Sequence, residues 1–150
     1  MKRGPWQSLW QHLDARMIAF MAARGVPLLR VSLGVVFVWF GLLKVIGQSP
    51  VRDLVARTVY GVSPDFFVPF LGVWEMCVGL GLLLAIALRL TLFLFWLQMA
   101  GTFLVLVLRP EIAFVNGSPF LLTMEGEFVI KNLVLIAGGL VIGSTVRRPR

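Results

Sequence analysis

Hydrophobic residues fall into four long runs along the chain, separated by short polar or charged stretches. A helix needs about 20 apolar residues to cross the hydrocarbon core of a bilayer, and each run has roughly that length. The runs therefore predict four transmembrane helices, at Pro27–Ile46, Phe66–Leu88, Leu90–Leu108 and Phe128–Val146. Only Arg89 and its neighbours separate the second helix from the third, so the turn between them must be tight.

A different pattern precedes the first run. Between residues 6 and 21, large apolar side chains recur at intervals of three, four and seven, which is the period of one helix face. They are Trp6, Leu9, Trp10, Leu13, Met17 and Phe20, and the other face carries Ser8, His12 and Arg16. The pattern is typical of an amphipathic helix that lies in the membrane interface with tryptophan at headgroup level. A docking helix for a partner subunit is the alternative.

Both loops on one side of the predicted bundle carry signals of local structure. Residues 49–61 combine a Ser-Pro start with apolar residues at helical spacing, which predicts a short amphipathic helix. Residues 109–127 contain Asn116-Gly117, a turn signal with apolar flanks. The second loop is therefore predicted to form a small hairpin or a re-entrant lid over the bundle.

Composition agrees with lipid as the solvent. The chain is 59% hydrophobic with a mean hydropathy of +0.91, whereas soluble domains are about 45–50% apolar. Lys and Arg outnumber Asp and Glu by 14 to 7. The basic residues lie at the ends of the apolar runs, which favours membrane orientation over nucleic-acid binding. The expected surroundings are the lipid bilayer, with no nucleic-acid partner.

The distribution of basic residues predicts the orientation. If both termini lie on one side, that side holds Lys2, Arg3, Arg16, Arg24, Arg30, Arg89, Arg147, Arg148 and Arg150. The loops of the opposite side hold only Arg52, Arg57 and Arg109. Because loops rich in Lys and Arg stay in the cytoplasm, both termini are predicted to be cytoplasmic, in the inner membrane of a bacterium or an archaeon.

The predicted fold is thus an all-α membrane protein, a four-transmembrane-helix bundle with an N-terminal interfacial amphipathic helix. Its parts are the cytoplasmic-side interfacial helix at 1–26, the transmembrane domain at 27–146 and a basic cytoplasmic tail at 147–150. Small residues in the runs predict close helix contacts, either within one bundle or between copies of the chain. These residues are Gly34, Gly41, Gly79, Gly81, Gly139 and Gly143.

Four ionisable residues lie within or at the edges of the runs: Lys44, Glu75, Glu127 and Lys131. With the predicted orientation all of them fall in the outer half of the membrane. A charge in lipid costs about 2.5–3.5 kcal/mol on insertion scales unless it is paired or hydrated, so we expect the four to face inward. Lys44 is predicted to pair with Glu75, and Lys131 to share that carboxylate or to pair with Glu127.

Uncharged polar and aromatic residues are candidates to complete this cluster. Asn132 follows Lys131, and Trp39, Trp74, Gln98 and Thr102 are candidates for the walls of a pocket. One interpretation is a buried ion-pair network that fixes the helix register. The other is a site for an anionic or quinone-like headgroup, and a third option is that both lysines extend to the interface.

The sequence contains no self-contained redox centre. It has one cysteine, Cys77, and one histidine, His12, so it offers neither an internal disulfide nor a haem held by two histidines. No metal-ligand cluster and no Gly-rich dinucleotide fingerprint is present in the sequence. No catalytic residue can be assigned, and whether the chain is an enzyme or a subunit of one stays open.

Three stretches of the chain together resemble the DoxX-like membrane proteins. They are "RVSLGVVFVWFGLLK", "GVWEMCVGLGLLLAIALRL" and "GEFVIKNLVLIAGGLVI". The shared pattern is R-x-x-L-G…F…G-x-x-K, then G-x-x-E…G-x-x-L, then a lysine at the start of the last helix, and it extends from Arg30 to Ile142. The resemblance implies a four-helix membrane bundle whose characteristic polar positions correspond here to Lys44, Glu75 and Lys131.

The resemblance also implies a function. Some DoxX-like proteins are membrane subunits of a thiosulfate:quinone oxidoreductase, and others belong to membrane-associated oxidative-stress complexes. The chain is therefore expected to be a membrane subunit associated with a quinone-linked or oxidative-stress-related oxidoreductase, with quinone as the candidate cofactor. The alternative is a non-enzymatic anchor or assembly subunit of a larger membrane complex. Other membrane subunits are the expected protein partners, and a homo-oligomer is a further option.

Overall fold

The computed structural model describes residues 5–50, 52–58 and 63–146. These residues form seven α-helices and one 3-10 turn: α1 Pro5–Val45, α2 Arg52–Thr58, α3 Pro64–Leu84, α4 Leu88–Leu108, α5 Pro110–Ala113, the turn Val115–Gly117, α6 Met124–Ile130 and α7 Asn132–Ser144. The predicted all-α membrane bundle is confirmed.

Four helical segments of the described chain are long and apolar enough to cross a membrane. They are Trp10–Val45 within α1, α3, α4, and Met124–Ser144, which joins α6 and α7. The predicted turn between the second and third spans is tight, since it consists of residues 85–87. Leu88 belongs to α4 rather than to the second span, because Ala85 and Ala87 adopt left-handed φ angles of 55° and 44° that end α3 first.

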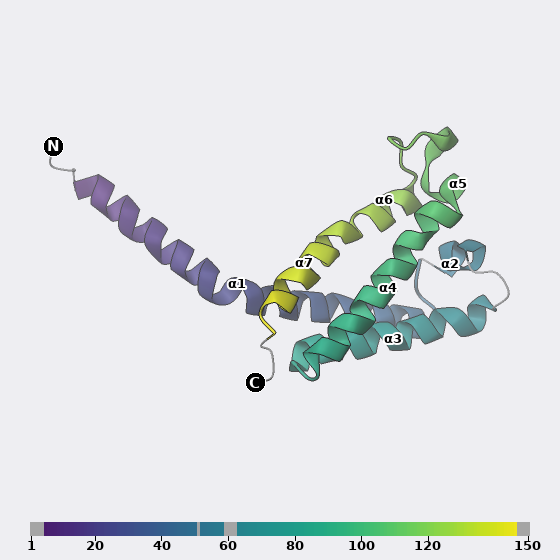
Figure 1. The fold of residues 1–150 in the computed structure, drawn as a ribbon, viewed down its shortest axis with the longest axis horizontal. Coiled ribbons are helices and arrows are strands. Elements are labelled where there is room, and N and C mark those ends of the chain that lie inside the picture. Colours follow the sequence, from purple (N-terminus) through teal and green to yellow (C-terminus); the bar gives the residue numbers. More distant parts are fainter. Residues whose placement is uncertain (1–4, 51, 59–62, 147–150) are drawn as a thin grey trace.

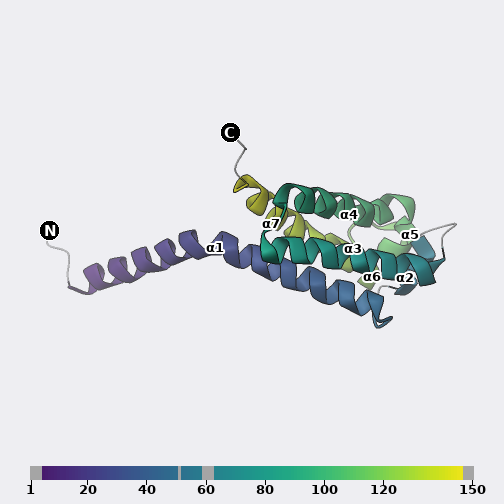
Figure 2. The ribbon, with the colours of Figure 1, turned by 90° about the horizontal axis from the view of Figure 1, so that it is seen from below.

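The N-terminal amphipathic segment and the first span form one continuous helix of 41 residues. Figures 1 and 2 show that α1 bends along its length and that its N-terminal part leaves the bundle. This part, taken as residues 10–26, is called the arm. Pro27 lies inside the helix, and a proline there removes a backbone hydrogen bond and crowds the preceding turn, which commonly produces a kink. Whether the arm lies in the membrane plane remains a prediction.

Glycines bring the C-terminal half of α1 into close contact with α3, and the two helices run side by side there in opposite directions (Figures 1 and 2). A Cβ atom added at Gly41 would lie 2.5 Å from the backbone oxygen of Gly72. One heptad away, a Cβ atom at Gly79 would lie 2.7 Å from the oxygen of Gly34. For these glycines, the predicted packing inside one bundle is observed.

The apolar core lies in the half of the bundle next to the α3–α4 turn. Its buried members come from all four spans: Leu33, Phe37, Val78, Leu82, Leu92, Phe95, Met99 and Ile142. The rings of Phe37 and Phe95 meet near its centre, with centroids 5.4 Å apart. Toward the opposite end, the α1–α3 pair and the α4–α6 pair diverge (Figure 1). The polar cluster described below lies beyond this core.

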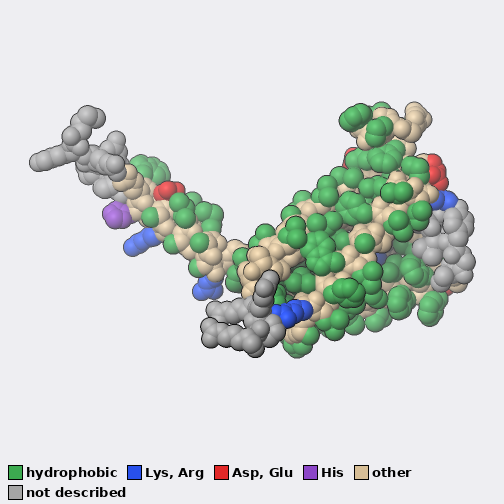
Figure 3. Space-filling model, in the orientation of Figure 1, with side chains coloured by type: hydrophobic (Ala, Val, Ile, Leu, Met, Phe, Trp, Pro, Cys, Tyr) green, Lys and Arg blue, Asp and Glu red, His purple; other side chains and the backbone are tan. Residues whose placement is uncertain are grey.

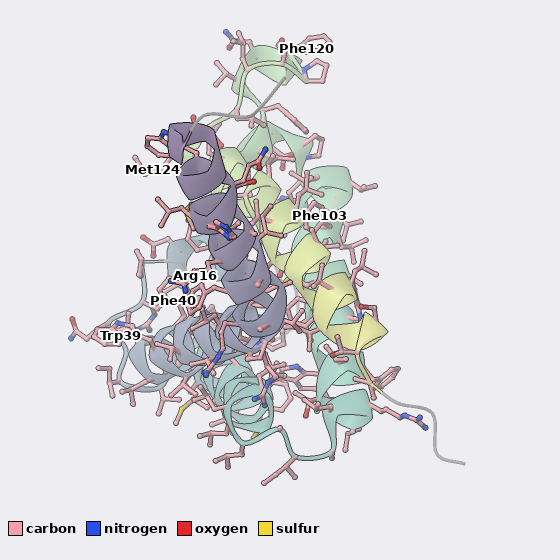
Figure 4. All side chains as sticks on the ribbon, turned by 90° about the vertical axis from the view of Figure 1, so that its left-hand side faces the viewer. Arg16, Trp39, Phe40, Phe103, Phe120 and Met124 are labelled. Carbon is pink, nitrogen blue, oxygen red and sulfur yellow. The ribbon has the colours of Figure 1, made fainter. Side chains whose placement is uncertain are left out.

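The long loop after α4 forms the predicted hairpin. The amide of Val115 donates to the carbonyl of Leu121 at 2.8 Å, and a single antiparallel bridge joins Phe114 to Leu122. The hairpin extends beyond the ends of α4 and α6 (Figure 1), and Phe120, 92% exposed, lies at its far end (Figure 4).

Candidate polar site

The centre of the candidate site is an ion pair between two helices. Lys44 lies in the last turn of α1, and its Nζ is 2.5 Å from Oε2 of Glu75 in α3. The two side chains are only 9% and 12% exposed. The predicted pairing of Lys44 with Glu75 is therefore present, and it satisfies both charges away from bulk solvent.

A third helix contributes Gln98, from the middle of α4. Its Nε2 donates to the other carboxylate oxygen of Glu75, Oε1, at 2.5 Å. Each oxygen of the carboxylate thus has its own donor, one cationic and one neutral. The sequence indicated Gln98 only as a wall residue, although it is the one amide side chain in the third run. Its own Oε1 is buried and has no hydrogen-bond partner among the described residues.

Two glycines make this pairing sterically feasible. Gly41 lies three residues before Lys44, and Gly72 lies three residues before Glu75, so each glycine shares a helix face with its charged residue. A Cβ atom at Gly72 would be 2.6 Å from the oxygen of Gly41 and 2.8 Å from Cβ of Lys44. The aliphatic part of Lys44 therefore packs directly on the glycine backbone. The G-x-x-K and G-x-x-E patterns are two halves of one contact.

The other predicted wall residues divide into two groups. Trp74 donates from Nε1 to the carbonyl of Leu94 at 3.2 Å, and Thr102 donates from Oγ1 to the carbonyl of Gln98 at 3.0 Å. Both bonds attach to the α4 backbone near the cluster. Trp39 is not a wall residue, because it is 64% exposed on a side of α1 that faces away from α4 (Figure 4). It lies five positions before Lys44, which turns it to a different helix face.

The prediction that all four charges form one inward-facing network is wrong. Glu127 and Lys131 are exposed, and within the described chain neither is in an ion pair with the other or with Glu75. Lys131 instead places its Nζ 3.8 Å from the centroid of the Phe128 ring. Asn132 is buried at 7% exposure, but no hydrogen bond joins it to the Lys44 cluster among the described residues.

Two small cavities border Lys44. The first, of about 60 Å³, lies between the end of α1 and the starts of α2 and α3, and it is lined by Lys44, Val45, Gly47, Ser49, Arg52, Pro64, Asp65, Val68 and Pro69. The second, of about 80 Å³, is lined by Phe40, Leu43, Lys44, Ser49, Pro50 and Phe128. Lys44 and Ser49 border both cavities. The site is therefore a buried cation between two hollows of different lining.

This arrangement has a defined chemical capacity. A lysine ammonium carries three N–H donors, and among the described residues Lys44 donates to one acceptor, Glu75. Its remaining donors are available to a carbonyl or anionic oxygen in either cavity. A second ion pair, between Arg52 and Asp65, lies at the first cavity and joins the start of α2 to that of α3.

Comparisons with protein-family models, curated proteins and solved structures gave no match to the chain. The resemblance to the DoxX-like proteins therefore rests on the residue pattern alone and stays a prediction.

Proposed function

We propose that the chain is a DoxX-like integral membrane subunit of a quinone-linked or oxidative-stress-related oxidoreductase, and that Lys44, Glu75 and Gln98 form its ligand site. The observation that supports this most directly is the arrangement of the Glu75 carboxylate. It accepts from Lys44 and from Gln98 at 2.5 Å each, beside cavities that Lys44 borders. A pair needed only for helix register requires neither the spare lysine donors nor the hollows.

Each residue of the site has a role in this proposal. Lys44 donates a hydrogen bond to an oxygen of the quinone head and favours negative charge there. Glu75 borders neither cavity and supplies one proton to the ligand through the ammonium of Lys44. When the carboxyl group is protonated, Gln98 rotates its amide so that its Oε1 accepts a hydrogen bond from it. Reduction of a quinone to a quinol consumes two electrons and two protons, and the second proton comes from water at the cavity of Arg52 and Asp65. The electrons come from a redox centre in a partner subunit.

The proposed location is the cytoplasmic membrane of a bacterium or an archaeon, with both termini in the cytoplasm. Its support is the concentration of Lys and Arg on the side of the termini and of the α3–α4 turn. The apolar exterior of the helices suits a bilayer, since large side chains such as Val107 (76%) and Val134 (74%) are exposed on the spans. In Figure 3, hydrophobic side chains cover most of the visible bundle surface.

Extraction of bound molecules tests the ligand role. The protein is purified in a mild detergent, and the lipophilic extract is analysed by chromatography and mass spectrometry. We expect about one quinone per chain in the wild type and a loss in Lys44→Met, while the matched variant Arg24→Met, which removes an exposed cation elsewhere on α1, retains it because Arg24 borders neither cavity. Wild-type protein that is folded and free of quinone would refute the proposal.

A second function, an anchor or assembly subunit, is supported by the arm of α1 (residues 10–26). The arm projects from the bundle (Figures 1 and 2) and exposes Trp10 (69%), Met17 (61%) and Phe20 (62%). In Figure 3 hydrophobic side chains gather on one side of the arm, opposite its arginines and histidine. A stable co-purifying protein without a small molecule would favour this function. A second copy of the chain would appear as a homo-oligomer in light scattering.

The orientation has its own test. In a Cys77→Ala background, single cysteines at Gln11→Cys in the arm and Phe120→Cys in the hairpin are exposed to an impermeant maleimide in intact cells. We expect labelling at position 120 only, because the hairpin and the arm lie at opposite ends of the spans. Labelling at position 11 alone would reverse the proposed topology.

A further inference from the structure

We infer that the ligand of the Lys44 site is a ring-headed amphiphile whose ring lies in the lipid-facing cavity between Phe40 of α1 and Phe128 of α6. This inference rests on the proposed function and specifies where the ligand is seated. It is carried by the different linings of the two cavities that share Lys44.

The cavity at Phe40 has an apolar and aromatic lining. Apart from Lys44 and Ser49, its walls are Phe40, Leu43, Pro50 and Phe128. Phe40 is 42% exposed, so the cavity lies at a side of α1 that faces the lipid of the surrounding leaflet. A molecule dissolved in the bilayer therefore reaches Lys44 here without crossing water.

Two phenyl rings from different helices favour a flat ring over an alkyl chain. Aromatic pairs gain about 0.5–1.5 kcal/mol beyond simple area burial when their rings stack or meet edge to face. Phe128 is further held by the ammonium of Lys131, 3.8 Å from its centroid, a contact that orients the ring from one side. The exposed lysine thus acts on the site through Phe128, as a positioning residue.

The size of the cavity defines how the ring is seated. Its volume is about 80 Å³, whereas an apolar cavity of about 150 Å³ holds a whole benzene molecule. The cavity therefore accepts the oxygen-bearing edge of a ring, while the far edge and any tail remain between the helices and the lipid. Lys44 at the end of the cavity supplies the donor for that oxygen.

The other cavity connects the same lysine to the aqueous side. Its lining includes Arg52 and Asp65, whose side chains are 51% and 73% exposed. Water can reach Lys44 from there, whereas the ligand ring lies on the lipid side. Ser49 and Lys44 form the shared wall between the two approaches.

Titration calorimetry with a decyl-substituted benzoquinone, on the purified full-length protein in detergent, tests whether the ring is seated in this cavity. We expect Phe40→Ala and Phe128→Ala to raise the Kd about tenfold each, the equivalent of about 1.4 kcal/mol. Lys44→Met should abolish binding.

Two control variants should keep a Kd within about twofold of the wild-type value. They are Phe93→Ala on α4, which also removes a large exposed side chain (60%), and Arg52→Gln at the aqueous cavity. Phe40→Leu and Phe128→Leu, which keep apolar bulk without a ring, serve where an alanine variant fails to fold.

The outcomes separate this inference from the proposed function. Unchanged binding in both phenylalanine variants, with binding lost in Lys44→Met, would overturn the seat between Phe40 and Phe128 and leave the ligand site intact. Weakened binding in Arg52→Gln alone would overturn it in favour of a seat in the cavity at Arg52 and Asp65. Equal affinity for decanoate would show that the ring is not recognised. If the wild-type protein binds no quinone, the proposed function itself fails.

Discussion

The two Lys–Glu pairs that the sequence offers differ in burial and in contact. Lys44 and Glu75 are far apart in sequence, yet they meet at 2.5 Å and are mostly buried. Glu127 and Lys131 are four residues apart on neighbouring turns, but both are exposed and no ion pair joins them in the described chain. Whether a lysine and a glutamate form an ion pair here therefore depends less on their separation in sequence than on the surface against which each helix packs.

The difference originates in the residues that flank each pair. Gly41 and Gly72 allow the α1 and α3 backbones to approach until Lys44 lies on Gly72. At the start of α6, Gly126 packs against the backbone of Ala113 at the end of α5. Glu127 is the next residue, about 100° further round the helix, and it is exposed. Lys131 then stabilises its charge over Phe128 rather than beside a carboxylate.

The largest expected effect comes from removing one member of the buried pair. Glu75→Leu strands the ammonium of Lys44, and breaking a buried pair from one side costs about 3–5 kcal/mol. The double variant Lys44→Met with Glu75→Leu should recover part of that loss. The free energy of unfolding, measured by SDS titration in mixed micelles, gives both numbers. A double variant no more stable than Glu75→Leu would mean that the charges are not coupled.

A smaller effect is expected from the glycine that allows the contact. Gly72→Ala places a methyl group against the oxygen of Gly41 and Cβ of Lys44, and overpacking of this kind costs about 1–3 kcal/mol. Gly101→Ala in α4 is the matched control, since nothing lies within 4 Å of its added Cβ atom. The same SDS titration should show no loss for the control. Equal stability of the two variants would contradict the close α1–α3 contact.

The smallest effect is expected at the exposed pair. Glu127→Gln should change the free energy of unfolding by less than about 0.5 kcal/mol, because an exposed charge contributes little. Lys131→Met should cost about 0.5–1 kcal/mol, since it also removes the contact of the ammonium with the Phe128 ring. Their double-variant cycle should show no coupling. A coupling energy near that of Lys44 and Glu75 would place the second pair inside the network after all.

Much of the fold could be predicted because the bilayer imposes simple rules on sequence. The length of the apolar runs predicted the four spans. Because Lys44 and Glu75 each lie within an apolar run, the sequence also indicated that these two charges must face a partner. Helical period alone could not show that the arm and the first span are one helix, because Pro27 permits either a break or a kink. The hairpin was predictable from Asn116-Gly117, but not its position beyond α4 and α6.

The sequence by itself determined that this is a membrane bundle and that Lys44 requires an acidic partner, since lipid tolerates neither open backbone nor lone charge. The sequence also predicted Glu75 as that partner, and only the tertiary structure decided which other residues join the pair. It brought Gln98 to the second oxygen of Glu75 and left Lys131 outside. The physical reason is helix rotation: a turn of one residue moves a side chain by about 100° around the axis. The rotation of each helix depends on the closest contacts available to its glycines, which no single run of sequence contains.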